Sequence, residues 1–297
     1  PTLAGAPVFP GLADKLDRVA RIEVVTPAAR FTLARRDDGW VAASAGGYPA
    51  RAARVNELLV AVAELELIAP RTARPELYPR LGVGSPKAPG AQSRRLTLMD
   101  AEGAVLADLI VGKQRHRRTG RRDQGTYVRR PGEARSYLAA GLLDLSDRIY
   151  PWLDSLLLDL DPARVRRIEI RHAEGGRLLA IRPGEGVPAM GLADLPSGAR
   201  PDVAAVRALP EILEGLRFDA VRRRAAVALP PPQAVTEVAT FDGLTVTLRV
   251  HRHDGAYWLT LDAAAADDAE AAIRAEAARL RRRGPGWAYW VADYLGA

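Results

Sequence analysis

The stretch Val19-Ala20-Arg21-Ile22-Glu23-Val24 recurs in the middle of the chain as Val165-Arg166-Arg167-Ile168-Glu169-Ile170. Both copies carry aliphatic residues at alternate positions, which is typical of a strand with one buried face. The interval between them is too long for the period of a solenoid repeat. The pair therefore predicts that one domain-sized unit occurs twice.

A similar order of elements follows each copy of this strand. A second strand and a turn come first, and then apolar residues at helical spacing, within 55–65 and within 206–216. In the second copy Asp202 is a good N-cap, and Pro210 is expected to kink or delay the helix. A hairpin comes next in each copy, and Asp242-Gly243 is a strong turn signal for the second one. The pattern predicts an α+β fold with two tandem copies of an antiparallel sheet plus a helix.

The domain limits follow from these patterns. We expect a first α+β unit over residues 1–145 and a second over residues 165–297. Residues 146–164 between them are too apolar for a free linker, so we expect a packed connecting segment. The second unit has an insertion, since residues 263–283 are rich in alanine and arginine and predict a long helix that Gly284-Pro285-Gly286 would stop.

Composition narrows the chemistry that the protein can perform. Hydrophobic residues make up 48% and charged residues 27% of the 297 residues, which is typical of a folded chain. The absence of cysteine removes disulfides, thiolate nucleophiles and cysteine-based metal sites. The formal charge is +7, and residues 111–135 alone hold nine basic and two acidic side chains. The positive charge is therefore local rather than a general signature of nucleic-acid binding.

A basic segment within this region is the candidate binding site. Its cationic side chains are Lys113, Arg115, Arg117, Arg118, Arg121 and Arg122. A basic hairpin tip of this kind can hold an anionic lipid headgroup or an acidic polysaccharide. The alternative is a solvated connection between two strands. No aromatic residue lies between the arginines, so specific binding of nucleic acid is not expected.

No catalytic constellation is recognisable, and we expect no cofactor. His251-Arg252-His253-Asp254 places two histidines two residues apart on a strand, a spacing that can bind a metal. A third ligand is not visible nearby, so we expect a solvent-facing strand end and no metal. These observations favour a non-enzymatic protein. The alternative is a hydrolase or metal-dependent enzyme that acts on an envelope polymer.

Six motifs together resemble a bacterial family described as domain of unknown function 4340. They are Phe9-Pro10-Gly11-Leu12, Val19-Ala20-Arg21-Ile22, Gly47-Tyr48-Pro49-Ala50, Thr72-Ala73-Arg74-Pro75-Glu76-Leu77-Tyr78, Leu106-Ala107-Asp108-Leu109-Ile110-Val111-Gly112-Lys113 and Thr240-Phe241-Asp242-Gly243-Leu244-Thr245-Val246. The resemblance implies an N-terminal membrane anchor ahead of an extracytoplasmic portion, and a basic helical tail at the C-terminus. It also implies genomic association with ABC transporter components of the gliding-motility auxiliary type. The family implies no catalytic residues for this chain.

The expected function follows from the resemblance and the duplicated units. We expect a non-enzymatic binding or scaffolding protein in the periplasm or another extracytoplasmic space, held at the inner membrane by a segment that precedes Pro1. Its expected partners are membrane transporter subunits or other envelope proteins. An anionic lipid or polysaccharide is a further expected ligand of the basic segment.

Overall fold

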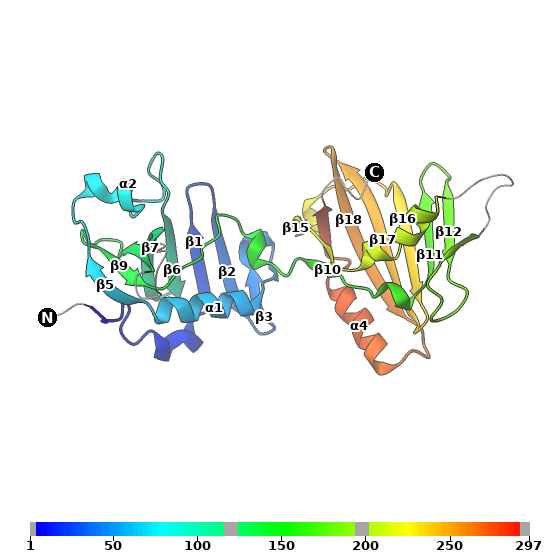
Figure 1. Ribbon diagram of the computed structural model, residues 1–297, viewed down its shortest axis with the longest axis horizontal. Coiled ribbons are helices and arrows are strands. Elements are labelled where there is room, and N and C mark those ends of the chain that lie inside the picture. Colours follow the sequence, from blue (N-terminus) through cyan, green and yellow to red (C-terminus); the bar gives the residue numbers. More distant parts are fainter. Residues whose placement is uncertain (1–3, 116–123, 194–201, 292–297) are drawn as a thin grey trace. The chain divides into compact units, whose positions relative to one another are not determined.

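The computed structural model describes residues 4–115, 124–193 and 202–291, and the chain divides into two compact units, Pro1–Asp154 and Ser155–Ala297 (Figure 1). Each unit is built on one large antiparallel sheet accompanied by a few helices, so the predicted α+β class is confirmed. No helix within the described ranges is long and apolar enough to cross a membrane.

The first unit has a nine-stranded sheet. Its strands lie in the order β4 (Tyr48–Pro49), β3 (Gly39–Ala42), β2 (Arg30–Arg36), β1 (Arg21–Val25), β6 (Arg94–Met99), β7 (Val105–Arg115), β8 (Gly125–Arg129), β9 (Ser136–Ala140) and β5 (Glu66–Pro70). The helical segments are η1 (Ala13–Arg18), η2 (Ala43–Ala45), α1 (Ala52–Ala63), η3 (Pro75–Leu77), α2 (Tyr78–Leu81) and η5 (Tyr150–Trp152). The N-terminal segment covers the edge at β5, where Val8 N–H donates to Leu65 O at 2.7 Å.

One face of this sheet forms the core of the unit. Alternate residues such as Ile22 and Leu33 are fully buried there, and α1 turns its own apolar side chains, including Val55, toward them. The chain returns to the same core after β9. Trp152 is completely buried, with its ring 6.5 Å from that of Phe31 and with the Arg54 guanidinium 4.8 Å above it. The segment after β9 is therefore part of the first unit's core.

The opposite face carries a smaller apolar cluster of Tyr78, Val83 and Ile110. The loop after α2 approaches β7 so closely there that a Cβ on Gly112 would lie 2.4 Å from Leu81 O. Only glycine fits at such a backbone contact. The pairing of β7 with β8 shifts register between residues 111 and 114, so β7 is irregular at the same place.

The second unit has an eight-stranded sheet and a separate two-stranded one. The larger sheet has the order β13 (Gly191–Ala193), β12 (Arg177–Ile181), β11 (Val165–His172), β16 (Ala234–Thr240), β17 (Leu244–His253), β18 (Ala256–Ala265), β19 (Trp287–Val291) and β15 (Ala220–Arg223), and the smaller pairs β10 (Leu156–Leu158) with β14 (Leu216–Arg217). The helical segments are η6 (Pro162–Arg164), α3 (Val203–Ala208), η7 (Glu211–Leu213), η8 (Arg224–Ala226) and α4 (Ala271–Arg282).

The two α-helices of the second unit differ in how well the sequence predicted them. The Asp202 carboxylate accepts hydrogen bonds from Ala204 N–H and Ala205 N–H, so the predicted N-cap is confirmed, and α3 ends before Pro210. The helix predicted over 263–283 is confirmed over Ala271–Arg282, where α4 ends just before Gly284, but its predicted start is wrong. The first residues of the predicted range extend β18 to Ala265, because β17 offers backbone partners that far, and tertiary pairing overrides the helix propensity of alanine.

The apolar residues 146–164 are shared between the units. Trp152 and Leu153 are buried in the first unit, whereas β10 pairs with β14 in the second. The division of the chain falls between Asp154 and Ser155. Residues 155–164 thus belong to the second unit and lead into β11.

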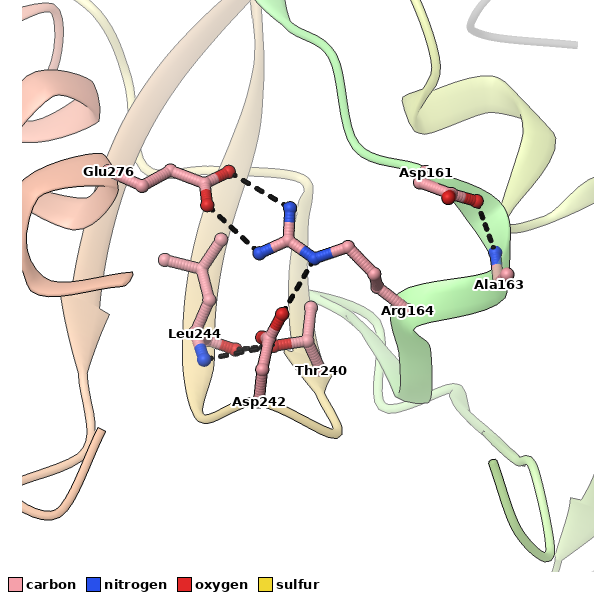
Figure 2. A network of polar contacts seen from close by, with 7 residues as sticks. All are labelled: Asp161, Ala163, Arg164, Thr240, Asp242, Leu244 and Glu276. Atoms are coloured by element: carbon pink, nitrogen blue, oxygen red, sulfur yellow. Dashed lines mark hydrogen bonds and ion pairs between the residues drawn. The ribbon is translucent and has the colours of Figure 1, made fainter. Parts of the chain in front are cut away.

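A network around Arg164 attaches α4 to the rest of its unit (Figure 2). The guanidinium forms two hydrogen bonds with the Glu276 carboxylate of α4, at 2.9 and 3.2 Å, and a third at 2.7 Å with Asp242 in the β16–β17 turn. The Thr240 hydroxyl in turn accepts from Leu244 N–H and donates to the Asp242 carboxylate, which fixes that turn. Three segments that are distant in sequence are joined by one side chain.

Candidate anion-binding cleft of the first unit

The structure places only part of the predicted basic segment. Lys113 and Arg115 lie at the end of β7, and Gln114 between them resumes the pairing with β8 opposite Thr126. Arg117, Arg118, Arg121 and Arg122 lie outside the described residues. The described part shows that the segment begins at the end of a strand whose last residues border a cleft.

The cleft has a volume of about 720 Å³ and is open to solvent. Four stretches that are far apart in the sequence form its walls: the β1–β2 turn, the start of β6, the end of β7 and the segment after β9. The lining residues are Pro27, Ala28, Ala91, Gln92, Arg94, Gly112, Lys113, Gln114, Leu143, Asp144, Leu145 and Asp147. Polar side chains from three of these stretches can therefore reach one ligand.

Most of the charged groups in the walls neutralise one another. Arg94 forms a bidentate ion pair with Asp147, at 2.8 and 3.0 Å, and Arg54 of α1 bonds Asp144 at 3.1 Å. Gln114 donates to Leu143 O at 3.0 Å, which holds the segment after β9 against β7. These contacts fix the shape of the cleft and leave its carboxylates paired.

Lys113 is the exception. Its ammonium forms no hydrogen bond or ion pair with any residue that the structure describes, and its side chain is exposed. A Cβ on Gly82 would lie 3.3 Å from Lys113 Cγ, so the aliphatic stem of the lysine runs beside Gly82. The packing of Gly82 and Gly112 thus positions, on the wall of the cleft, a cation that has no partner among the described residues.

This arrangement suits the binding of an anion. A single ammonium group is a compact positive charge that attracts phosphate or carboxylate without demanding one geometry. Neighbouring amide groups of Gln92 and Gln114 supply further polar contacts for a ligand in the cleft. In the sequence, Lys113 is also the first residue of the predicted basic segment.

The two histidines considered as metal ligands have other roles. His251 is buried, contrary to the expectation of a solvent-facing strand end, because it packs under the chain at Pro230. Its Nδ1 lies 2.7 Å from Pro230 O and its Nε2 lies 3.3 Å from Thr260 Oγ1, so both ring nitrogens are engaged. His253 Nε2 lies 3.3 Å from Asp254. Within the described ranges no group of three or more potential ligands could hold a metal ion.

Sequence reasoning missed most of the cleft. Arg94 and Asp147 are 53 residues apart, and neither belongs to a local motif. Only Lys113 was identified, because it adjoins a run of arginines. Gly112 offered a weak signal, since glycine within a strand often marks close backbone contact.

A two-unit α+β protein with an open polar cleft is the class that these features define. The family model described as a domain of unknown function (DUF4340) matches residues 40–237, more than half of the chain, so the chain belongs to that family. The match begins in β3 and ends in β16, and so it spans both units. Searches of the curated proteins and of the solved structures find no match.

Proposed function

We propose that the protein is a non-enzymatic extracytoplasmic binding or scaffolding protein, an accessory component of an ABC-type membrane transport system. The observation that carries the binding role is the cleft of about 720 Å³ with Lys113 on its wall, a cation that no described residue pairs with and that begins the basic segment in the sequence. The transport context and the membrane anchor are what the family resemblance implies. Co-purification of the membrane-anchored protein with transporter subunits tests that context, and purification without any such subunit contradicts it.

The ligand of the basic segment is an anionic surface of the envelope. Each basic residue close to an anionic leaflet contributes roughly 1 kcal/mol, so several together dock a domain against it. The attraction is screened over about 8 Å at physiological ionic strength, so the segment acts only near its target. The binding is therefore weak and sensitive to salt.

Binding to vesicles tests this role. We expect the protein to bind vesicles with an anionic lipid at low salt, and to lose that binding when Arg117, Arg118, Arg121 and Arg122 are all changed to serine. A matched control changes Arg80, Arg148, Arg279 and Arg281 to serine, which removes the same charge from other exposed positions. Wild-type protein that does not bind at low salt, or equal loss in both variants, contradicts a localised site.

We also infer that the two units are copies of one ancestral unit, which is a finer statement than the α+β class. With β4 left out, the strand orders of the two large sheets correspond place for place. Ion pairs recur at the same register: Arg30 with Glu23 at 2.7 Å, and Arg177 with Glu169 at 2.8 Å. In the second unit Leu160 N–H donates to Leu213 O, as Val8 N–H donates to Leu65 O in the first.

A further inference from the structure

The second unit has a hollow of about 250 Å³ at the β17–β18 hairpin. It is lined by Arg224, Arg249, Thr260, Leu261, Asp262 and Pro285. Arg249 and Thr260 are directly paired in the ladder, and the neighbouring pair, Leu248 with Leu261, is buried in the core. Because side chains alternate between the two faces of a sheet, Arg249 and Thr260 lie on the face opposite to the core.

The two arginines of this hollow have no acidic partner among the residues that the structure describes. Neither Arg224 nor Arg249 forms an ion pair with a residue in the described part of the chain. The carboxylates of Glu169 and Glu237 on the same sheet are bound by Arg167 and by other arginines. Two guanidinium groups thus border one hollow with their charge uncompensated by an ion pair.

Their positive charges converge on one region. Burial is the largest cause that lowers the pKa of His251, and the charges of Arg224 and Arg249 lower it further. Pro230 O can only accept, so Nδ1 of His251 donates to it and Nε2 accepts from the Thr260 hydroxyl. Thr260, which lines the hollow with the two arginines, is therefore held in place by a neutral His251 behind it.

The corresponding place in the first unit is filled. When the two strand orders are matched, β7 and β8 correspond to β17 and β18. Ile110 of β7 then corresponds to Arg249, and its partner Arg129 of β8 corresponds to Thr260. Ile110 packs with Tyr78 there, and the Arg129 guanidinium lies 4.5 Å above the Tyr78 ring. The second unit thus has an open, cationic hollow where the first has an apolar cluster.

We propose that Arg224 and Arg249 together bind a small oxyanion of the phosphate type, free or as the phosphate group of a small ester. Planar guanidinium groups match the oxygens of phosphate in a bidentate manner, and two of them can engage different edges of the tetrahedron. Asp262 also faces the hollow, although its Oδ1 accepts from Ala263 N–H at 2.9 Å. Its negative charge weakens the binding of any anion. Removal of this charge should therefore strengthen binding, whereas removal of the arginine charges should weaken it.

Titration of the whole chain with inorganic phosphate at low salt tests the site. The four arginines of the basic segment are first changed to serine, so that the proposed function and this site cannot be confused. In that background we expect saturable binding by calorimetry. Changing both Arg224 and Arg249 to glutamine should weaken binding at least about tenfold, because each charged hydrogen bond contributes roughly 1.5–3 kcal/mol and 1.4 kcal/mol is a factor of ten.

Two further variants control for general charge. Asp262→Asn should bind phosphate more tightly, and Arg252→Gln, on the same strand but beside the Tyr257 ring, should bind as the background does. Thermal unfolding checks that each variant is folded. Absence of saturable binding in the background protein, equal weakening by Arg252→Gln, or unchanged binding in the double variant overturns the proposal. Addition of a phosphate monoester, compared with inorganic phosphate, distinguishes the two sources of the anion.

Discussion

Glu169 is a buried carboxylate that three arginines keep ionised. It accepts hydrogen bonds from Arg171 Nε and Arg177 Nε, each at 2.8 Å, and also pairs with Arg167. The bonds from Arg171 and then Arg177 are the main causes that lower the pKa of Glu169 from 4.5 to about 2. The charged form is thus favoured in the folded state more than in the unfolded chain.

This pKa shift gives stability a dependence on pH. A carboxylate with a lowered folded-state pKa stabilises the fold above pH 4.5, and that contribution is lost as the pH falls toward 2. We expect the urea concentration at the midpoint of unfolding to decrease for the wild type as the pH is lowered from 4.5 toward 2. The decrease should be smaller for Glu169→Gln. Glu174→Gln, in an exposed turn, serves as the control. Parallel pH profiles for wild type and Glu169→Gln would refute the assignment.

The helix α4 depends on one side chain for part of its attachment. Burial alone would raise the pKa of Asp242, but the hydrogen bonds from Arg164 and Thr240 outweigh it and lower the pKa. Removal of Arg164 leaves both Asp242 and Glu276 without this partner (Figure 2). Since these groups are only partly buried, we expect Arg164→Ala to cost about 1–3 kcal/mol.

The loss should be local. Arg164→Ala should speed amide hydrogen exchange in α4 more than in β11, and Arg164→Lys should be intermediate, because lysine keeps the charge but lacks the planar fork. Arg279→Ala, at an exposed position of the same helix, is the matched control. Equal exchange in the Arg164→Ala and Arg279→Ala proteins would contradict a role for the network.

Secondary structure could be predicted wherever local rules govern it. The apolar stripe of α1, the cap at Asp202 and the turn at Asp242-Gly243 all rest on residues within a few positions of one another. The error at Ala263 has the opposite cause. Alanine is compatible with a strand when a partner strand is available, and that partner is not visible in the local sequence.

The candidate cleft could be predicted only at Lys113. Its other polar walls depend on the ion pair of Arg94 with Asp147 and on the path of the chain after β9, which passes back over the sheet. Such contacts join segments whose separation follows no fixed spacing. Charge composition identified a region of interest, and tertiary structure was needed to identify the cleft beside it.

The limits of the two units differ from those that the sequence predicted. The predicted first unit ended at residue 145, but Trp152 is completely buried in its core, and Arg51 N–H donates to Trp152 O at 2.8 Å. The predicted second unit began at residue 165, but β10 pairs with β14 ahead of that point. Each unit therefore needs residues from the segment that was predicted to connect them.

This difference leads to a test with truncated chains. Deletion of a buried tryptophan side chain costs about 3–5 kcal/mol, a large part of the stability of a domain of this size. We expect a fragment of residues 1–154 to fold with a cooperative urea transition, and a fragment of residues 1–145 to be unfolded or much less stable. Trp152→Ala in the longer fragment should reproduce most of the loss, whereas Arg148→Gln, at an exposed position of the same segment, should have little effect. If the shorter fragment is as stable as the longer one, residues 146–154 are dispensable and the first unit ends where the sequence alone suggested.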